Sequence, residues 1–441
     1  MRNLNIFLFE WKHFIRSPFK VLAVLLFIIA GVYGLHTGSD LYHKQSEEIS
    51  KIDEETRASQ LEVLQKHYET GNYSDEDRPW IDYSDPYWAI RYASIYHFKK
   101  PSAAMVFSIG QAEQYGFYKQ IKFWSSPYDA DLAEEIANPE RLQTGTLDFS
   151  FAVLFLMPLV LLVLVYNLKS AETEQGFLSL IEVQHPSSRG WLISRLGFHG
   201  LLLYLVTIGL LIYGANLTDV FASAGNAFGQ MVFYTFIYLL FWILLYALIL
   251  MRGKSILMNT LQMAGLYLLF AFIIPATVHQ ILSIRQPANL MTDFIDVRDQ
   301  QNEIYDLEDS IVENNLIELF PELEQSVVYT DRVDVGMVRR RTIIALVNEL
   351  KKKSVLQIEQ ENENKNMFIS SSFVYNPLSF FQNKLNRIST THYDDYQQYR
   401  DEIQLLIDAQ INVLVQDMWN SRSVDKARYQ EYNVLFTTIT K

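Results

Sequence analysis

Five runs of the sequence are almost free of charge and long enough to cross a lipid bilayer. A hydrocarbon core of about 30 Å requires about 20 apolar residues of α-helix. A charge near the middle of such a helix costs about 2.5 to 3.5 kcal/mol on insertion scales, so these runs favour a membrane over a soluble core. We therefore predict an all-α integral membrane protein with five transmembrane helices, spans 1 to 5, at 19–36, 149–168, 196–216, 230–250 and 256–282.

Whole-chain averages conceal these spans, because the mean hydropathy of +0.03 is that of an ordinary soluble protein. Most Asp and Glu residues fall in 37–148 and 285–441, within a net charge of −13. The chain has no cysteine, which excludes disulfides and zinc sites built on thiolates. Span 1 could be a cleaved signal peptide, but the residues after it lack a small-x-small cleavage pattern, so we interpret it as a retained anchor.

Basic residues in the short connections predict the orientation. Lys and Arg precede span 1 and occupy the connections 169–195 and 251–255, whereas the short loop 217–229 has none. Because Lys and Arg are enriched on the cytoplasmic side, the N terminus is predicted to be cytoplasmic. Segments 37–148 and 285–441 are then extracytoplasmic, and we expect them to form one mainly helical domain near the membrane.

Residues 1–18 predict a separate amphipathic helix. Their apolar residues recur at helical spacing, and most of the charged ones fall elsewhere on the helical wheel. The apolar set is Leu4, Phe7, Leu8, Trp11, Phe14 and Ile15, and the charged set includes Glu10, Lys12 and Arg16. We expect this helix to lie along the inner membrane surface and to end where Pro18 begins span 1. The alternative is a simple cytoplasmic extension of that span.

Signatures of enzymes and metal sites do not fit the chain. The Gly-Lys-Ser at 253–255 follows apolar helix instead of the glycine that a phosphate-binding loop needs, and no histidines have the HExxH spacing. The acidic run at 75–85 lacks the glycine and terminal glutamate of a calcium loop. Asn259 and Gln262 in span 5 are expected to bond a neighbouring helix. We therefore predict no catalytic residue, no metal and no nucleic-acid partner.

The connection between spans 2 and 3 carries an unusual pattern. Glu172 and Glu174 follow the apolar run, Gly176 interrupts the helix, and a short amphipathic piece (FLSLIEV) comes next. Carboxylates at an exposed helix end can meet basic residues of a partner, and a rigid short helix can pass the movement of that partner to the spans. The plainer alternative is a charged loop that only keeps the turn in water.

This pattern resembles the permease subunits of type 2 ABC exporters, which carry Glu-x-Glu-x-Gly, a short helix and a Pro-x-Ser-Arg turn between spans 2 and 3. Stretches 101–118, 144–162 and 376–389 are similar to a bacterial branch with large extracytoplasmic inserts after spans 1 and 5. The resemblance implies that 169–195, here called the coupling segment, docks on a separate cytoplasmic ATPase. The residues it assigns to coupling are Glu172, Glu174, Gln175, Gly176, Phe177, Pro186 and Arg189, with Glu10, Trp11 and Arg16 on the N-terminal helix as a second surface.

The resemblance further implies a permease of the bacterial cytoplasmic (inner) membrane that pairs with a second copy or a paralogue. It would move an unidentified substrate using ATP and Mg bound by the partner ATPase, with no cofactor in this chain. The alternative is a transmission or scaffold subunit that acts on an envelope partner without translocating a substrate. A lateral opening to lipid would favour transport, and a closed bundle under long rigid outer helices would favour transmission. Such permeases normally have six spans, so we expect a sixth after Lys441.

Overall fold

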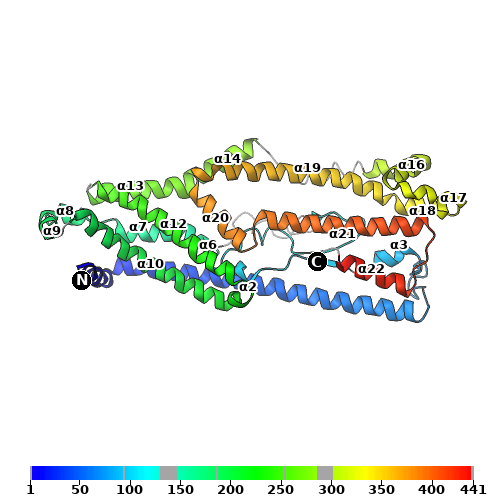
Figure 1. The fold of residues 1–441 in the computed structure, drawn as a ribbon, viewed down its shortest axis with the longest axis horizontal. Coiled ribbons are helices and arrows are strands. Elements are labelled where there is room, and N and C mark those ends of the chain that lie inside the picture. Colours follow the sequence, from blue (N-terminus) through cyan, green and yellow to red (C-terminus); the bar gives the residue numbers. More distant parts are fainter. Residues whose placement is uncertain are drawn as a thin grey trace.

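The computed structural model describes residues 2–92, 95–129, 147–184, 187–252, 255–285 and 301–438. The molecule is elongated, with two parts along its long axis (Figure 1). One end holds the apolar helices and is here called the span bundle. The other end, here called the polar domain, is formed by most of 64–129 and 301–438; the turn at Ala103–Val106 and one helix of the second range pack into the span bundle instead.

Among the described residues, five helices are long and apolar enough to span a membrane, which fits the predicted all-α membrane class. They cover Pro18–Glu69, Phe149–Glu174, Ser188–Leu217, Gly225–Met251 and Ile256–Arg285. The elements of this end are α1 (Arg2–Ile15), α2 (Pro18–Val63), α6 (Phe149–Phe151), α7 (Met157–Val165), α8 (Ser170–Glu174), α9 (Leu178–Gln184), α10 (Ser188–Leu217), α11 (Val220–Ser223), α12 (Gly225–Met251), α13 (Ile256–Leu268) and α14 (Ile274–Arg285), with π-helical turns η3 (Ala152–Leu156) and η4 (Leu269–Ile273).

The polar domain is also helical. Its helices are α3 (Pro86–Tyr92), α16 (Asp309–Leu319), α17 (Val327–Asp331), α18 (Val335–Thr342), α19 (Ile344–Ser371), α21 (Tyr393–Trp419) and α22 (Lys426–Thr438), with shorter turns η1 (Leu64–Glu69), η5 (Pro321–Gln325) and η6 (Ser372–Val374). The turn η2 (Ala103–Val106) packs on α2 and α10 in the core of the span bundle. Strands β1 (Tyr96–Phe98) and β2 (Tyr118–Gln120) pair antiparallel, with Tyr96 opposite Gln120. Residues from both polar segments share one hydrophobic core, which includes Ile81, Phe123, Leu316, Ile407 and Trp419.

Helix α2 joins the two parts without a break. It has 46 residues, so at about 1.5 Å per residue it extends about 69 Å, roughly twice the thickness of a hydrocarbon core. The sequence predicted a span at 19–36 followed by a mainly helical outer segment, whereas in the structure one continuous helix runs from the span into that segment (Figure 1). Gly34 and Gly38 allow close packing on this rod, because a Cβ there would lie 2.4 Å from the backbone of Asp148 and 2.7 Å from that of Val106.

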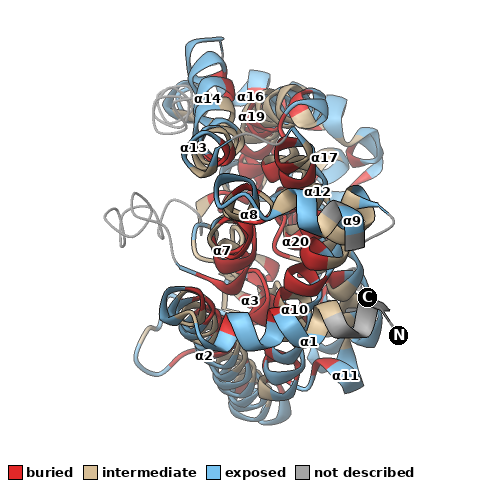
Figure 2. Cartoon of the chain, turned by 90° about the vertical axis from the view of Figure 1, so that its left-hand side faces the viewer, coloured by how far each residue is buried: buried red, intermediate tan, exposed pale blue. Residues whose placement is uncertain are grey.

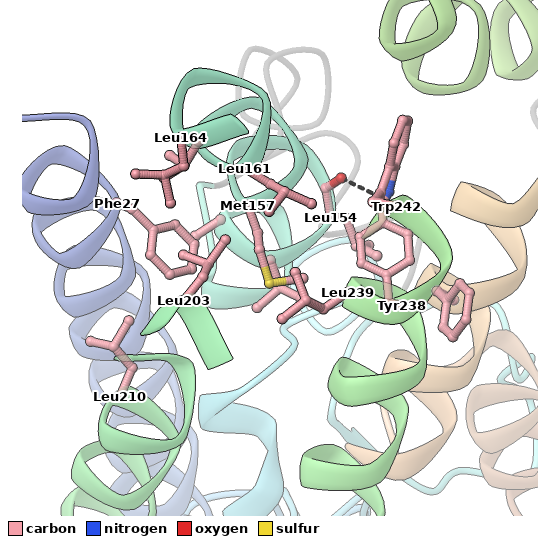
Figure 3. Close-up of a cluster of buried hydrophobic side chains, with 14 of the residues drawn as sticks. Phe27, Leu154, Met157, Leu161, Leu164, Leu203, Leu210, Tyr238, Leu239 and Trp242 are labelled. Atoms are coloured by element: carbon pink, nitrogen blue, oxygen red, sulfur yellow. Dashed lines mark hydrogen bonds between the residues drawn. The ribbon is translucent and has the colours of Figure 1, made fainter. Parts of the chain in front are cut away.

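The core of the span bundle surrounds span 2 (Figure 3). Pro158 has no N–H, so it cannot bond the carbonyl oxygen of Leu154 one turn earlier. The hydroxyl of Tyr238 on α12 donates to that oxygen instead, at 2.6 Å (Figure 3). Tyr267 on α13 donates to the next carbonyl, that of Phe155, at 3.1 Å. Tyrosines of neighbouring helices therefore donate hydrogen bonds to backbone carbonyl groups near the proline and the π-helical turn η3. Such bonds are needed in a membrane, where no water can replace them.

One helix from the second polar segment packs into the span bundle. Helix α20 (Pro377–Ile388) buries Leu378, Phe381 and Leu385 in the core of the bundle, and the ring centroids of Phe381 and Tyr238 are 4.9 Å apart. It also contacts η3 and η4 of spans 2 and 5. The sequence assigned all of 285–441 to a segment outside the membrane; α20 packs among the spans because its apolar residues form one face.

Candidate functional site

The coupling segment lies at the far end of the span bundle, away from the polar domain (Figure 1). Helix α8 ends in a motif that glycine favours: the N–H of Gly176 donates to Thr173 O at 3.2 Å, and the N–H of Phe177 donates to Glu172 O at 2.8 Å. Gly176 has a φ of +79°, a left-handed value that costs other residues about 1 to 2 kcal/mol. The glycine therefore provides the break that redirects the chain into α9.

Helix α9 presents apolar side chains to the outside. Phe177 is 54% exposed, Leu180 is 55% exposed and Val183 is 85% exposed. Their spacing of three residues places them on neighbouring turns of one side of the helix. Figure 2, which looks at this end of the molecule, shows α8 and α9 at its surface together with α1. An exposed apolar stripe on a short projecting helix is suited to contact with another protein or with a membrane surface.

The two carboxylates of the motif are bound within the chain. Glu172, with its side chain 21% exposed, forms an ion pair with Nη1 of Arg195 on α10. Glu174 accepts a hydrogen bond at 2.8 Å from the N–H of Ile256, in the first turn of α13. The sequence predicted that both would meet a partner, but in this structure Glu172 holds the coupling segment to span 3 and Glu174 caps span 5.

Arg195 also binds the N-terminal helix. Its Nε lies 2.5 Å from Oε1 of Glu10 on α1. The Glu10 side chain is fully buried, and its Oε2 lies 3.2 Å from Nε2 of His199. Burial alone would raise the pKa of Glu10, but the hydrogen bond from His199 and the charge of Arg195 outweigh it and hold the pKa below its usual value. Glu10 is therefore a buried anion at neutral pH and not part of the water-facing surface of α1.

Lys20 completes this cluster at the start of span 1. Its ammonium donates to Leu164 O at 2.6 Å and to Oδ1 of Asn167 at 3.3 Å, at the end of span 2, where helix carbonyls lack partners. The cluster of Glu10, Lys20, Glu172, Arg195 and His199 is here called the charged junction. It contains two carboxylates, one lysine and one arginine, so its formal charges balance when these four groups are ionised and His199 is neutral.

The other predicted site residues divide between surface and interior. Gln175, Arg189 and Arg16 are exposed, and Trp11 is 46% exposed on the outer side of α1. Pro186 lies outside the described residues. Asn259 donates to Ser170 Oγ at 2.5 Å, which confirms that it bonds a neighbouring helix.

Sequence reasoning missed Arg195, His199 and Lys20 as members of a site. Arg195 and Lys20 contributed only to the count of basic residues that set the orientation. Two signals were available in the sequence. Glu10 lies three residues after Phe7 and four before Phe14, and so on the apolar face of its helix. Arg195 and His199 are four residues apart, and so on one side of a helix.

Comparison with known protein families, with curated proteins and with solved structures finds no match to this chain. Within the described part of the chain, no group of three His, Asp or Glu side chains is placed to hold a metal ion. Function must therefore be inferred from the resemblance of the sequence motifs and from the geometry of the span bundle.

Proposed function

We propose that this chain is a membrane-spanning permease subunit of an ABC-type exporter, driven by a separate cytoplasmic ATPase that docks on α8 and α9. The observation that carries the proposal is the exposed stripe of Phe177, Leu180 and Val183 at α9, directly after α8, which the charged junction ties to span 3. The resemblance of this segment to the permeases of type 2 exporters supports the same assignment. ATP and Mg would be bound by the partner.

The geometry supplies a route for movement. Helix α8 lies directly after span 2, and Lys169 before it donates to Met251 O at 3.3 Å, at the end of span 4. Glu174 is bonded to the start of span 5. A displacement of α9 by a partner would therefore act on the ends of spans 2, 4 and 5 together.

A groove on the outside of the bundle favours transport. Spans 1 and 2 form an open groove of about 240 Å³ between them. Its lining residues are all apolar and include Phe19, Leu22, Leu26, Leu159 and Val163. Phe19, Leu22 and Leu26 are each more than half exposed, so the groove opens on the side that would face lipid. A lateral opening of this kind suits an apolar or amphipathic substrate.

The second candidate is a transmission subunit, and the continuity of α2 favours it. A single helix of 46 residues couples span 1 to the polar domain, so movement in the bundle would reach an envelope partner without a substrate. Transport of a labelled amphipathic substrate across reconstituted vesicles separates the two candidates, because only the permease would move it.

The test of docking is co-purification of the full chain from its native membrane, followed by ATP hydrolysis in lipid. We expect an ATP-hydrolysing chain to co-purify, and Val183→Glu to remove it, because a buried unpaired charge opposes an apolar contact. Ser223→Glu adds the same charge at an exposed position at the opposite end of the bundle and should leave the complex intact. An unchanged complex and unchanged hydrolysis in Val183→Glu would contradict docking at α9.

A further inference from the structure

The charged junction connects two elements that have separate packing partners. Helix α1 packs on α10 and α2, whereas α8 packs on α13. Arg195 on α10 reaches both, with Nε directed to Glu10 of α1 and Nη1 to Glu172 of α8. The two carboxylates use different nitrogens, so both contacts exist at the same time.

The chemistry of the arginine suits this double contact. A guanidinium presents its donors in a fixed planar fork, whereas an ammonium is a single point charge that cannot hold two separated carboxylates with the same geometry. Cζ of Arg195 lies over the Trp191 ring, 4.7 Å from its centroid, and this cation–π contact helps to hold the guanidinium in place. Glu10 has no exposed surface, so the contact cannot be replaced by water without opening the junction.

We propose that Arg195 is a positioning residue that locks α1 and α8 to the start of span 3, so that these three elements move as one rigid body against the other spans. This extends the partner-facing site from α9 to the N-terminal helix, and that extension rests on the proposed function. A partner that displaces α9 would then also tilt α1, whose Trp11 and Ile15 lie on its exposed side. The start of span 1 would be displaced through Lys20, which is bonded to the end of span 2.

The locking itself can be measured without any partner. The chain has no cysteine, so Lys12→Cys on α1 and Ser179→Cys on α9, both exposed positions, give one spin-label pair in the full chain in lipid nanodiscs. We expect a narrow distance distribution. Arg195→Met should broaden it and add a population at longer distance, and Arg195→Lys should do the same while keeping the charge. A second pair, Trp80→Cys with Ser223→Cys, reports whether the fold away from the junction is unchanged.

The outcomes are distinct. An unchanged Lys12–Ser179 distribution in Arg195→Lys, with an unchanged control pair, overturns the lock. If Arg195→Met also changes the distances of the control pair, its effect is not specific to the junction. The test then rests on the Lys12–Ser179 distances in Arg195→Lys and Glu172→Gln, because each of these variants keeps a polar side chain in place. A lock that is present in a chain that binds no ATPase contradicts the proposed function alone, and an ATPase that binds a chain with no lock contradicts this inference alone.

Discussion

The two ends of span 2 are held in different ways. At the end next to the polar domain, Asp148 accepts hydrogen bonds from the backbone N–H of Phe151 at 2.8 Å and of Ile109 at 3.0 Å, and from the Ser150 hydroxyl. At the other end, the long side chains of Lys20, Arg195 and Glu172 reach across four helices. At the first end one short side chain binds the backbone of two segments, whereas at the second end long side chains bind mostly one another.

Of the two ends, the one at the coupling segment is held by contacts that can change more easily. Backbone contacts at Asp148 leave little freedom, and the close approach of Gly34 to the backbone of Asp148 adds to this. Long charged side chains lose more conformational entropy when they are fixed, and they can be released and fixed again without breaking a helix. We therefore expect the end of span 2 at Asp148 to stay fixed and the end at the coupling segment to move. The π-helical turn η3 and Pro158 lie between the two ends.

Glu172→Lys should have the largest effect, because it places a cation against Arg195 in a mostly buried site. Like charges in such contacts cost several kcal/mol of stability. Because the side chain at 172 is partly exposed and water screens its charge, we expect a loss on the order of 3 kcal/mol. Glu174→Lys should cost much less, because Glu174 is exposed and caps a helix end. Thermal unfolding of both variants in detergent checks this; equal effects would mean that the junction does not hold Glu172.

Asp148→Ala should cost about 3 kcal/mol, because it removes an N-cap and leaves the buried N–H of Ile109 without a partner. The loss should appear as a lower unfolding temperature, with ATPase coupling retained in the folded fraction. Asp148→Asn keeps an acceptor oxygen and serves as the matched variant with a smaller loss. If Asp148→Ala instead uncouples a stable protein, this end is not a passive anchor.

Gly176→Val should cost about 1 to 2 kcal/mol locally, because a β-branched residue resists a φ of +79°. No side chain or backbone atom lies within 4 Å of a Cβ at this position, so the effect comes from conformation and not from a clash. We expect the ATPase to bind while its hydrolysis responds less to the permease. Gly209→Val, on α10 where a Cβ also meets nothing within 4 Å, is the control.

Tyr238→Phe should have the smallest effect, about 1 kcal/mol, which is typical of a hydrogen bond between membrane helices. It removes the donor to Leu154 O that the proline leaves unpaired. Tyr204→Phe removes a weaker bond to Val232 O at 3.3 Å and should change the unfolding temperature less. Equal losses in the two variants would show that the break at Pro158 needs no partner.

How far the sequence could predict the fold depends on the physics of each part. Each predicted span lies within one of the five long apolar helices, because the apolarity that suits a residue to lipid can be read directly from the sequence. The continuation of α2 past residue 36 was missed. The change from apolar to charged residues marks where the helix leaves lipid for water, but it does not mark an end of the helix. The packing of α20 into the span bundle was not predicted, because its 12 residues are too few for a span and its packing partners lie far away in the sequence.

The candidate site was predictable in part. The break at Gly176 and the projecting helix follow from local sequence, since a left-handed residue after a short helix is a property of a few neighbours. The partners of Glu172 and Glu174 did not follow, because Arg195 and Ile256 approach them only through the packing of α10 and α13. Charge patterns along the chain show which side chains are available, but not which of them meet.

The most direct test of the proposed function is photo-crosslinking in living cells from a reactive residue placed at Val183, the most exposed apolar side chain of α9. We predict one dominant product with a cytoplasmic protein that carries an ATP-binding phosphate loop, and no such product from the same residue placed at Ser223. Crosslinking of the same ATPase from both positions, or of no ATPase from Val183, would contradict docking at the coupling segment.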